Sequence, residues 1–298
     1  MPLVLITLIF IFLTNTVFLP NFFASLSERA QMICQSHAPW SPYAAWYSGI
    51  VCGTSVRGEP FYDEVVHSGL IHLLVVSGSH LVFLETLIIY LSKLARRGKP
   101  LPSIFIDLLL LGYVVLTGWQ TPALRSLIFI LLKKINQRCK LFWTPVWLTA
   151  FSIPLAAAMS DARGYSLSLA LSWVAALALH TRLSHETFFR RMILVFIFTW
   201  PILAMLTPPT LQTILFNTLL APILGFLLFP ISALPFFYRP LTTLTDNLWW
   251  VFFWLMDHLS SPIRNPHPAL SFSLPYAFLY AVLLQIICLR RKFSRGDM

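Results

Sequence analysis

The chain has 298 residues, of which 57% are hydrophobic and only 11% are charged, with a mean hydropathy of +0.75 and a net charge of +10. An ordinary globular domain has about 25% charged residues to cover its surface, so this composition excludes a soluble domain as well as a disordered chain. It predicts an all-α, polytopic helical membrane protein. No phosphate-binding loop, dinucleotide fingerprint, HExxH pair or CxxC pair occurs, so uphill transport would draw its energy from a gradient or from another protein.

Apolar runs separated by proline, glycine or charge clusters predict about ten membrane segments. In chain order they lie at 3–19, 69–92, 103–118, 122–132, 142–159, 165–180, 192–206, 212–234, 247–259 and 274–289. A straight span needs about 20 residues, so 122–132 and 247–259 can also be re-entrant or interfacial. Proline within or beside many segments predicts broken helices, since a membrane tolerates the freed carbonyls only where neighbours or water satisfy them.

The basic residues predict the orientation. With a cytoplasmic N-terminus and strict alternation, most of the 21 Lys and Arg residues fall in cytoplasmic loops or in the C-terminal tail, and Arg239 is among them. Such an excess is the usual pattern of cytoplasmic loops. We therefore expect both termini in the cytoplasm, and the net charge needs no nucleic acid to explain it.

The chain divides into three parts: an N-terminal membrane anchor at 1–20, a short extracytoplasmic segment at 21–68, and a transmembrane domain with a basic tail at 69–298. The first run lacks a basic start and a good cleavage site, so a retained anchor is favoured over a signal peptide. Within the outer segment, YAAWYSGIV at 43–51 is apolar enough to lie in the interface, with its Trp and Tyr at headgroup level.

Cysteine usage follows the same topology. Cys34 and Cys52 both fall outside, where an oxidising periplasm allows a disulfide, whereas Cys139 and Cys288 fall inside and stay reduced. The alternative is that all four are buried or free thiols, since free cysteine is among the most buried residue types.

Polar residues interrupt the second predicted segment, which begins GLIHLLVVSGSH at 69–80. At that depth polar groups are costly and usually face a cavity or a partner helix. His72 and His80 share one helical face, Ser77 and His80 can approach each other, and Gly78 lets a neighbouring backbone come close. These residues leave two interpretations open: a functional path, or packing with His and Ser hydrogen-bonded across the bundle.

This stretch resembles the signature of the ComEC competence family, the inner-membrane DNA-uptake channel of naturally transformable bacteria. The matching positions are Gly69, His72, Ser77, Gly78 and His80. LTGWQTPALRS at 116–126 resembles the family's Thr-Gly turn and following Arg, with matches at Thr117, Gly118, Pro122 and Arg125.

Two further blocks follow in the family's order. GYSLSLALSW at 164–173 matches at Gly164, Tyr165, Leu167 and Ser168, although Ser166 stands where the family usually has Gln. FNTLLAPILGFLLFP at 216–230 matches at Asn217 and Pro222. The resemblance covers roughly residues 40–290, and four ordered blocks are more specific than any one of them.

The resemblance implies a multi-pass protein of the bacterial inner membrane, whose residues 69–298 form a competence-type channel for single-stranded DNA entering the cytoplasm. Full-length members also carry an OB-fold-like domain and often a metallo-β-lactamase-like nuclease domain. This chain has no room for either and no HxHxDH motif, so we expect no enzyme activity, no metal and no cofactor. The implied partners are single-stranded DNA, membrane lipid, a periplasmic DNA receptor and a cytoplasmic ATPase, and a separate nuclease and a homodimer are compatible with it.

Arg125 is the one basic residue inside a predicted segment. It can contact a phosphate or gate the path; otherwise it pairs with Glu85, Asp107 or Asp161, or it snorkels to the headgroups. His72 and His80 can line the path as polar groups, and Asn217 can do so near a break at Pro222.

Two other functions stay open. One is a small-solute transporter, or a degenerate relative that no longer handles DNA. The other is an intramembrane hydrolase that uses Ser77 or Ser79 with His72 or His80, although the sequence shows no oxyanion donor and no orienting acid beyond Glu85.

Overall fold

The computed structural model describes residues 18–70, 78–96, 98–160, 166–180, 188–204, 219–220, 223–260 and 274–293. Within these ranges every regular element is a helix and there is no strand, which confirms the all-α class. In chain order the elements are α2 (Phe18–Ser36), α3 (Ala44–Cys52), α4 (Tyr62–His67), α6 (Gly78–Ala95), α7 (Ser103–Leu116), α8 (Thr121–Arg138), α9 (Pro145–Met159), α10 (Leu167–His180), α11 (Phe188–Leu203), the π-helical turn η1 (Leu224–Leu228), α13 (Phe229–Phe237), the 3₁₀ turn η2 (Arg239–Leu241), α14 (Thr242–Ser260) and α15 (Leu274–Phe293).

Most predicted segments correspond to one of these helices. Among the described residues, α6 is the one helix long and apolar enough to cross a membrane by length and composition. Shorter apolar helices lie at Ser103–Leu116, Pro145–Met159, Leu167–His180, Ile193–Leu203, Leu224–Phe237 and Pro275–Cys288. The expected ten spans and the orientation of both termini stay predictions. The anchor predicted at 1–20 lies almost entirely outside the described residues.

A disulfide joins α2 to α3 through Cys34 and Cys52, the pairing that the sequence had left open. The turn between α7 and α8, residues 117–120, docks beside this bond. Gln31 of α2 donates a hydrogen bond to the Cys52 carbonyl at 3.1 Å, and Gln120 of the turn donates to the Gly53 carbonyl at 2.9 Å. We refer to Gln31, Cys34, Cys52, Gly53 and residues 117–120 as the disulfide junction. It fixes where α8 begins.

The junction is tight enough to require glycine. Gly53 has a left-handed backbone with φ of +72°, and a Cβ there would lie 2.3 Å from the Thr117 carbonyl oxygen. Trp119 anchors the turn from the other side. Its ring stacks on Phe23 with centroids 4.6 Å apart, and its Nε1 donates to the Met159 carbonyl at 2.8 Å. The turn is therefore held by α2, α3 and the end of α9.

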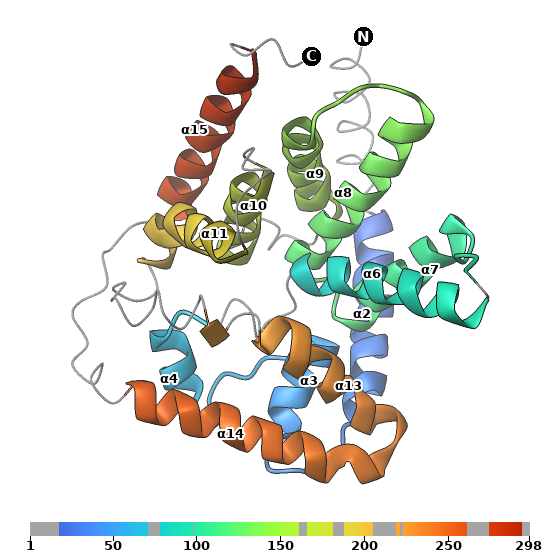
Figure 1. Ribbon diagram of the computed structural model, residues 1–298, viewed down its shortest axis with the longest axis vertical. Coiled ribbons are helices and arrows are strands. Elements are labelled where there is room, and N and C mark those ends of the chain that lie inside the picture. The colour runs from blue at the N-terminus through green and yellow to red at the C-terminus, as the bar shows by residue number, and fades with distance from the viewer. Residues whose placement is uncertain are drawn as a thin grey trace.

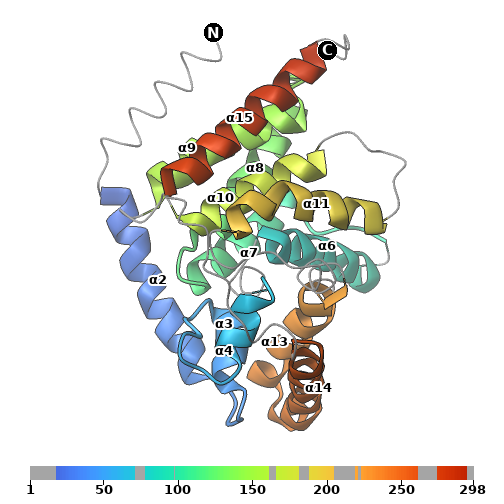
Figure 2. The ribbon, with the colours of Figure 1, turned by 90° about the vertical axis from the view of Figure 1, so that its left-hand side faces the viewer.

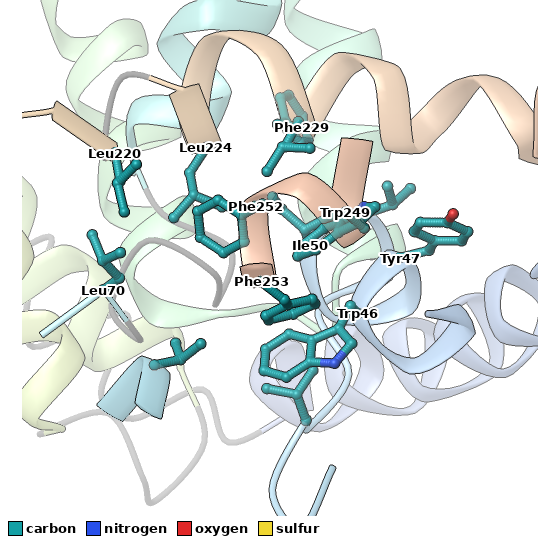
Figure 3. Packing of buried hydrophobic residues seen from close by; sticks show 14 of the residues in the cluster. Trp46, Tyr47, Ile50, Leu70, Leu220, Leu224, Phe229, Trp249, Phe252 and Phe253 are labelled. Carbon is teal, nitrogen blue, oxygen red and sulfur yellow. The ribbon is translucent and has the colours of Figure 1, made fainter. Parts of the chain in front are cut away.

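A buried aromatic cluster, formed by Trp46, Tyr47, Phe229, Trp249, Phe252 and Phe253, packs α3 against α13 and α14 (Figure 3). Trp46 and Tyr47 are 2% and 0% exposed. These two rings therefore face other helices and not lipid headgroups, whereas the depth of residues 43–51 in the membrane stays a prediction. Trp249 and Phe253 of α14 cover the rings of α3, with Trp46 and Phe253 centroids 4.9 Å apart.

The start of α14 is tied to the segment predicted to be extracytoplasmic. Ser41 donates to the Asp246 carboxylate at 2.5 Å, and the Tyr47 hydroxyl donates to the same oxygen. Burial and this second hydrogen bond raise the pKa of Tyr47, which keeps it a neutral donor. Further along α14, the Phe253 ring stacks on Phe61 at 4.6 Å. Both halves of α14 thus contact residues 41–61.

This arrangement corrects the predicted topology. Strict alternation put the residues before α14, including Arg239, in the cytoplasm and Ser41 outside. Hydrogen-bonded groups cannot lie on opposite sides of about 30 Å of hydrocarbon, so these two placements cannot both hold. In Figures 1 and 2, α14 runs across the end of the molecule next to α3 and α4, roughly perpendicular to α2. This agrees with the alternative that residues 247–259 are not a straight span.

Three charged side chains connect α6, α7 and α8. Lys134 Nζ lies 2.5 Å from an Asp107 carboxylate oxygen and 3.6 Å from a Glu85 oxygen. All three side chains are partly buried. Two of the carboxylates that the sequence offered to Arg125 are therefore paired with a lysine from the other end of α8.

We expect Gly53→Ala to destabilise the protein through the contact with Thr117 in addition to its left-handed backbone. Gly58 is the matched control, because it also has a positive φ of +87° but nothing lies within 4 Å of its added Cβ. Gly58→Ala should cost only the backbone penalty of about 1–2 kcal/mol. Gly53→Ala should cost roughly 1–3 kcal/mol more, measured as thermal unfolding in detergent. Equal losses for the two variants would contradict the close docking.

We also expect Lys134→Met to destabilise the bundle, because it leaves Asp107 and Glu85 without their shared cation. The side chains are partly exposed, so the loss should be on the order of 1 kcal/mol. Lys133→Met is the control, since Lys133 is the exposed neighbour on the same helix. Unchanged unfolding temperatures for Lys134→Met would show that the triad contributes nothing.

Candidate functional site

The structure describes some or all of the matched positions in the first three resemblance blocks and none of those in the fourth. Gly69 follows α4, Gly78 and His80 belong to α6, Thr117 and Gly118 form the α7–α8 turn, Arg125 lies in the first turns of α8, and Ser168 begins α10. His72, Ser77, Gly164, Asn217 and Pro222 lie outside the described residues. The fourth block is represented by its second half, η1 and the start of α13.

The first and second blocks meet where α6 crosses α8. A Cβ on Gly78 would lie 2.1 Å from Ser126 Oγ and 3.2 Å from Arg125 Nη2. The two helices can therefore approach this closely only because position 78 has no side chain. This contact brings α6 directly against the Arg125 side chain.

Arg125 is buried, with 6% of its surface exposed. Its Nε donates to Ser172 Oγ of α10 at 2.9 Å, and its Nη2 donates to Ser126 Oγ at 3.1 Å. The alternative of a salt bridge to Glu85 or Asp107 does not hold, because Lys134 binds both carboxylates, and the burial of Arg125 excludes snorkelling. Asp161 lies outside the described residues. Within the described chain, two serine hydroxyls hold the guanidinium.

Ser172 is a site residue that the sequence analysis missed. It lies in the third resemblance block, one helical turn after Ser168, whose hydroxyl instead pairs with Ser166 at 2.8 Å. The i, i+4 spacing placed Ser172 on the same face of α10 as Ser168. Ser172 is not one of the positions that match the family's pattern, so the motif did not indicate it.

The first and fourth blocks meet through aromatic rings. His80 is buried, and its ring stacks on Phe229 with centroids 4.4 Å apart and an interplanar angle of 11°. Phe229 also meets Phe83 and Tyr113 edge-on, with centroids 6.1 and 6.0 Å apart. Phe229 directly follows the π-helical turn η1, and π turns occur frequently at functional sites.

Thr117 and Gly118 have a different place. The Thr117 hydroxyl donates to the Val114 carbonyl at 3.1 Å within α7. Gly118 has a φ of +82° and lies against Gln31 of the disulfide junction. These two matched residues thus position the start of α8 and do not contact the guanidinium of Arg125.

Arg125 and its two serine partners form an arrangement that can bind an anion. A buried guanidinium without a carboxylate is costly, and it can donate to an anionic oxygen together with the neighbouring hydroxyls. Ser79 is exposed whereas His80 is buried, so these neighbours do not share one pocket. The described residues hold no cluster of His, Cys, Asp and Glu that could bind a metal.

We expect Gly78→Ala to separate α6 from α8, because its Cβ would overlap Ser126 Oγ. The double variant Gly78→Ala with Ser126→Ala should recover much of the loss, since the nearest remaining Ser126 atom is Cβ at 3.3 Å. Gly112→Ala is the control, as nothing lies near its added Cβ. The measurement is membrane accumulation and thermal unfolding. A Gly78→Ala protein as stable as the Gly112→Ala control would contradict the contact.

Comparison with known proteins supports the resemblance. A family model described as Competence protein matches residues 50–293, a range that includes all four resemblance blocks. No curated protein and no solved structure matches the chain. Since the matched range is most of the sequence, this chain belongs to the competence protein family, as its likeness to the ComEC membrane module predicted.

Proposed function

We propose that the chain forms a path through the bacterial inner membrane for single-stranded DNA during natural transformation, and that it is neither a nuclease nor an ATPase. Membership of the competence family supports a role in DNA uptake. The finer role as a multi-pass channel is our inference from the site.

The observation that carries this proposal is the environment of Arg125. Single-stranded DNA carries about one negative charge per nucleotide, so it needs polar groups to cross the hydrocarbon. Arg125 provides a buried cation whose described partners, Ser126 and Ser172, are neutral hydroxyls that a phosphate oxygen can replace. It also lies where the first three resemblance blocks converge.

A single such contact suits transport better than a row of them. Conduction requires that each binding site also releases the substrate, and several strong phosphate clamps would stall the strand. Among the described residues, the other charged groups between α6, α7 and α8 are the paired Lys134, Asp107 and Glu85. The phosphate would therefore meet one cation and several hydroxyls.

The family implies the remaining partners. A periplasmic receptor would deliver the strand and a cytoplasmic ATPase would pull it. A separate nuclease would degrade the second strand, and a homodimer is compatible with the scheme. Membrane lipid would surround the exposed apolar side chains of the helices.

A small-anion transporter is the second candidate. It is favoured by the same observation, because one guanidinium recognises any phosphate or carboxylate. The two functions differ in whether a polymer can pass.

The test is transport into liposomes that contain the purified protein, under an imposed inside-positive potential. Labelled single-stranded DNA and inorganic phosphate are compared. We expect DNA to enter, and Arg125→Gln to reduce entry about tenfold or more, because the phosphate contact is lost from a buried site. Arg138→Gln, an exposed arginine on the same helix, is the control and should transport normally.

Three outcomes would contradict the proposal. Entry of phosphate without DNA would favour the small-anion transporter. Normal DNA transport by Arg125→Gln would remove the guanidinium from the path. Failure of both Arg125→Gln and Arg125→Lys to accumulate, together with normal transport by the fraction that does insert, would make the arginine structural, since lysine cannot reproduce its forked contacts.

A further inference from the structure

The ring of Phe229 covers two polar aromatic residues at once. Its face stacks on His80 of α6 at 4.4 Å, and it meets Tyr113 of α7 edge-on at 6.0 Å. In Figure 3, Phe229 and Leu224 lie together at one side of the buried hydrophobic core. Phe229 thus places an apolar ring against two side chains that can hydrogen-bond.

The Tyr113 hydroxyl is unusual in this state. It is buried and has no hydrogen-bond partner among the described residues. Most buried hydroxyls in native structures are paired, and an exception calls for an explanation. A second arrangement, in which water or an anionic oxygen reaches Tyr113, would supply the missing partner.

The backbone of Phe229 provides a way to reach such an arrangement. Its amide donates to the Leu224 carbonyl, five residues earlier, which closes the π turn. In an α-helix the same amide would donate to the Gly225 carbonyl. Exchanging the five-residue hydrogen bonds of this turn for four-residue ones shifts the register by one residue, which turns the side chain by about 100° around the axis.

The next residue keeps the α register the less stable of the two. Pro230 has no amide hydrogen, so the Phe226 carbonyl lacks the partner that would lock an α-helical register. Gly225 has open space around its Cα, with nothing within 4 Å of an added Cβ. Gly225 itself therefore does not hold the turn, which is anchored in the core by Leu224 and Leu228.

The covered residues lie on a different face of α6 from the Arg125 contact. Gly78 contacts Arg125 and Ser126, whereas residues two positions apart on a helix point in nearly opposite directions, and His80 faces Phe229. Withdrawal of Phe229 would expose His80 and Tyr113 and so create a polar surface between α6 and α7.

We propose that Phe229 is a gate, and that conversion of the π turn η1 to an α register moves its ring off His80 and Tyr113 and opens a hydrated path between α6, α7 and η1. This rests on the proposed function for the identity of the substrate. The closed state is the one in which the ring is stacked on His80. Opening would accompany passage of the strand and would otherwise be a minor state, which keeps the membrane sealed.

The test is the leak of chloride from liposomes that contain the purified protein and no DNA. A minor open state is typically populated at about 0.1–10%, so Phe229→Ala should raise the leak about tenfold or more. Phe226→Ala is the matched control, since Phe226 belongs to the same turn but is exposed. A Phe229→Ala protein as tight as the unsubstituted protein would overturn the gate. Because no DNA is present, this result is independent of whether DNA is the substrate.

A second variant covers the case in which Phe229→Ala fails to accumulate. Pro230→Ala keeps the ring and supplies the missing amide, which can donate to the Phe226 carbonyl and so favour the α register. It should raise the leak, whereas Pro235→Ala in α13 should not. An unchanged leak for Pro230→Ala would show that the register of η1 does not control the path.

Discussion

The arrangement of this bundle depends on the burial of one guanidinium. Arg125 lies inside the helices, where a charge is tolerated only with hydrogen-bond partners. Ser126 and Ser172 supply them from α8 and α10. Gly78 allows α6 to close over the same point. The site therefore consists of three helices held around a cation, and it leaves that cation able to exchange a hydroxyl for an anionic oxygen.

The disulfide junction sets the position of that cation. Cys34 and Cys52 fix α2 to α3, and the α7–α8 turn docks on Gly53 so closely that only glycine fits. Since Arg125 lies one turn after the start of α8, its depth in the bundle follows from this docking. The aromatic cluster continues from the junction to α14 and to Phe229. The Cys34–Cys52 disulfide, the α7–α8 turn and Phe229 thus belong to one connected core.

The motif residues of the sequence divide into two groups in space. Gly78 lies against Arg125, and His80 lies two positions along the same helix, where its ring stacks on Phe229. Thr117 and Gly118 belong to the disulfide junction, so their match to the family reflects packing. Ser172, Tyr113 and Phe229 complete the site, but they carry no signal in the sequence beyond an apolar or small polar side chain on a helix. Their importance comes from neighbours that are remote in the chain.

The sequence by itself determined the helical class, most helix positions and the family, and its composition is typical of a membrane protein. It could do so because hydropathy, proline placement and short ordered motifs are local properties. The tertiary structure alone decided which groups pair. Arg125 has serine partners because Lys134 already binds Asp107 and Glu85. Helix α14 runs beside residues 41–61 because Asp246 accepts hydrogen bonds from Ser41 and Tyr47. Helical periodicity tells which residues share a face, but it does not tell which helix will cover that face.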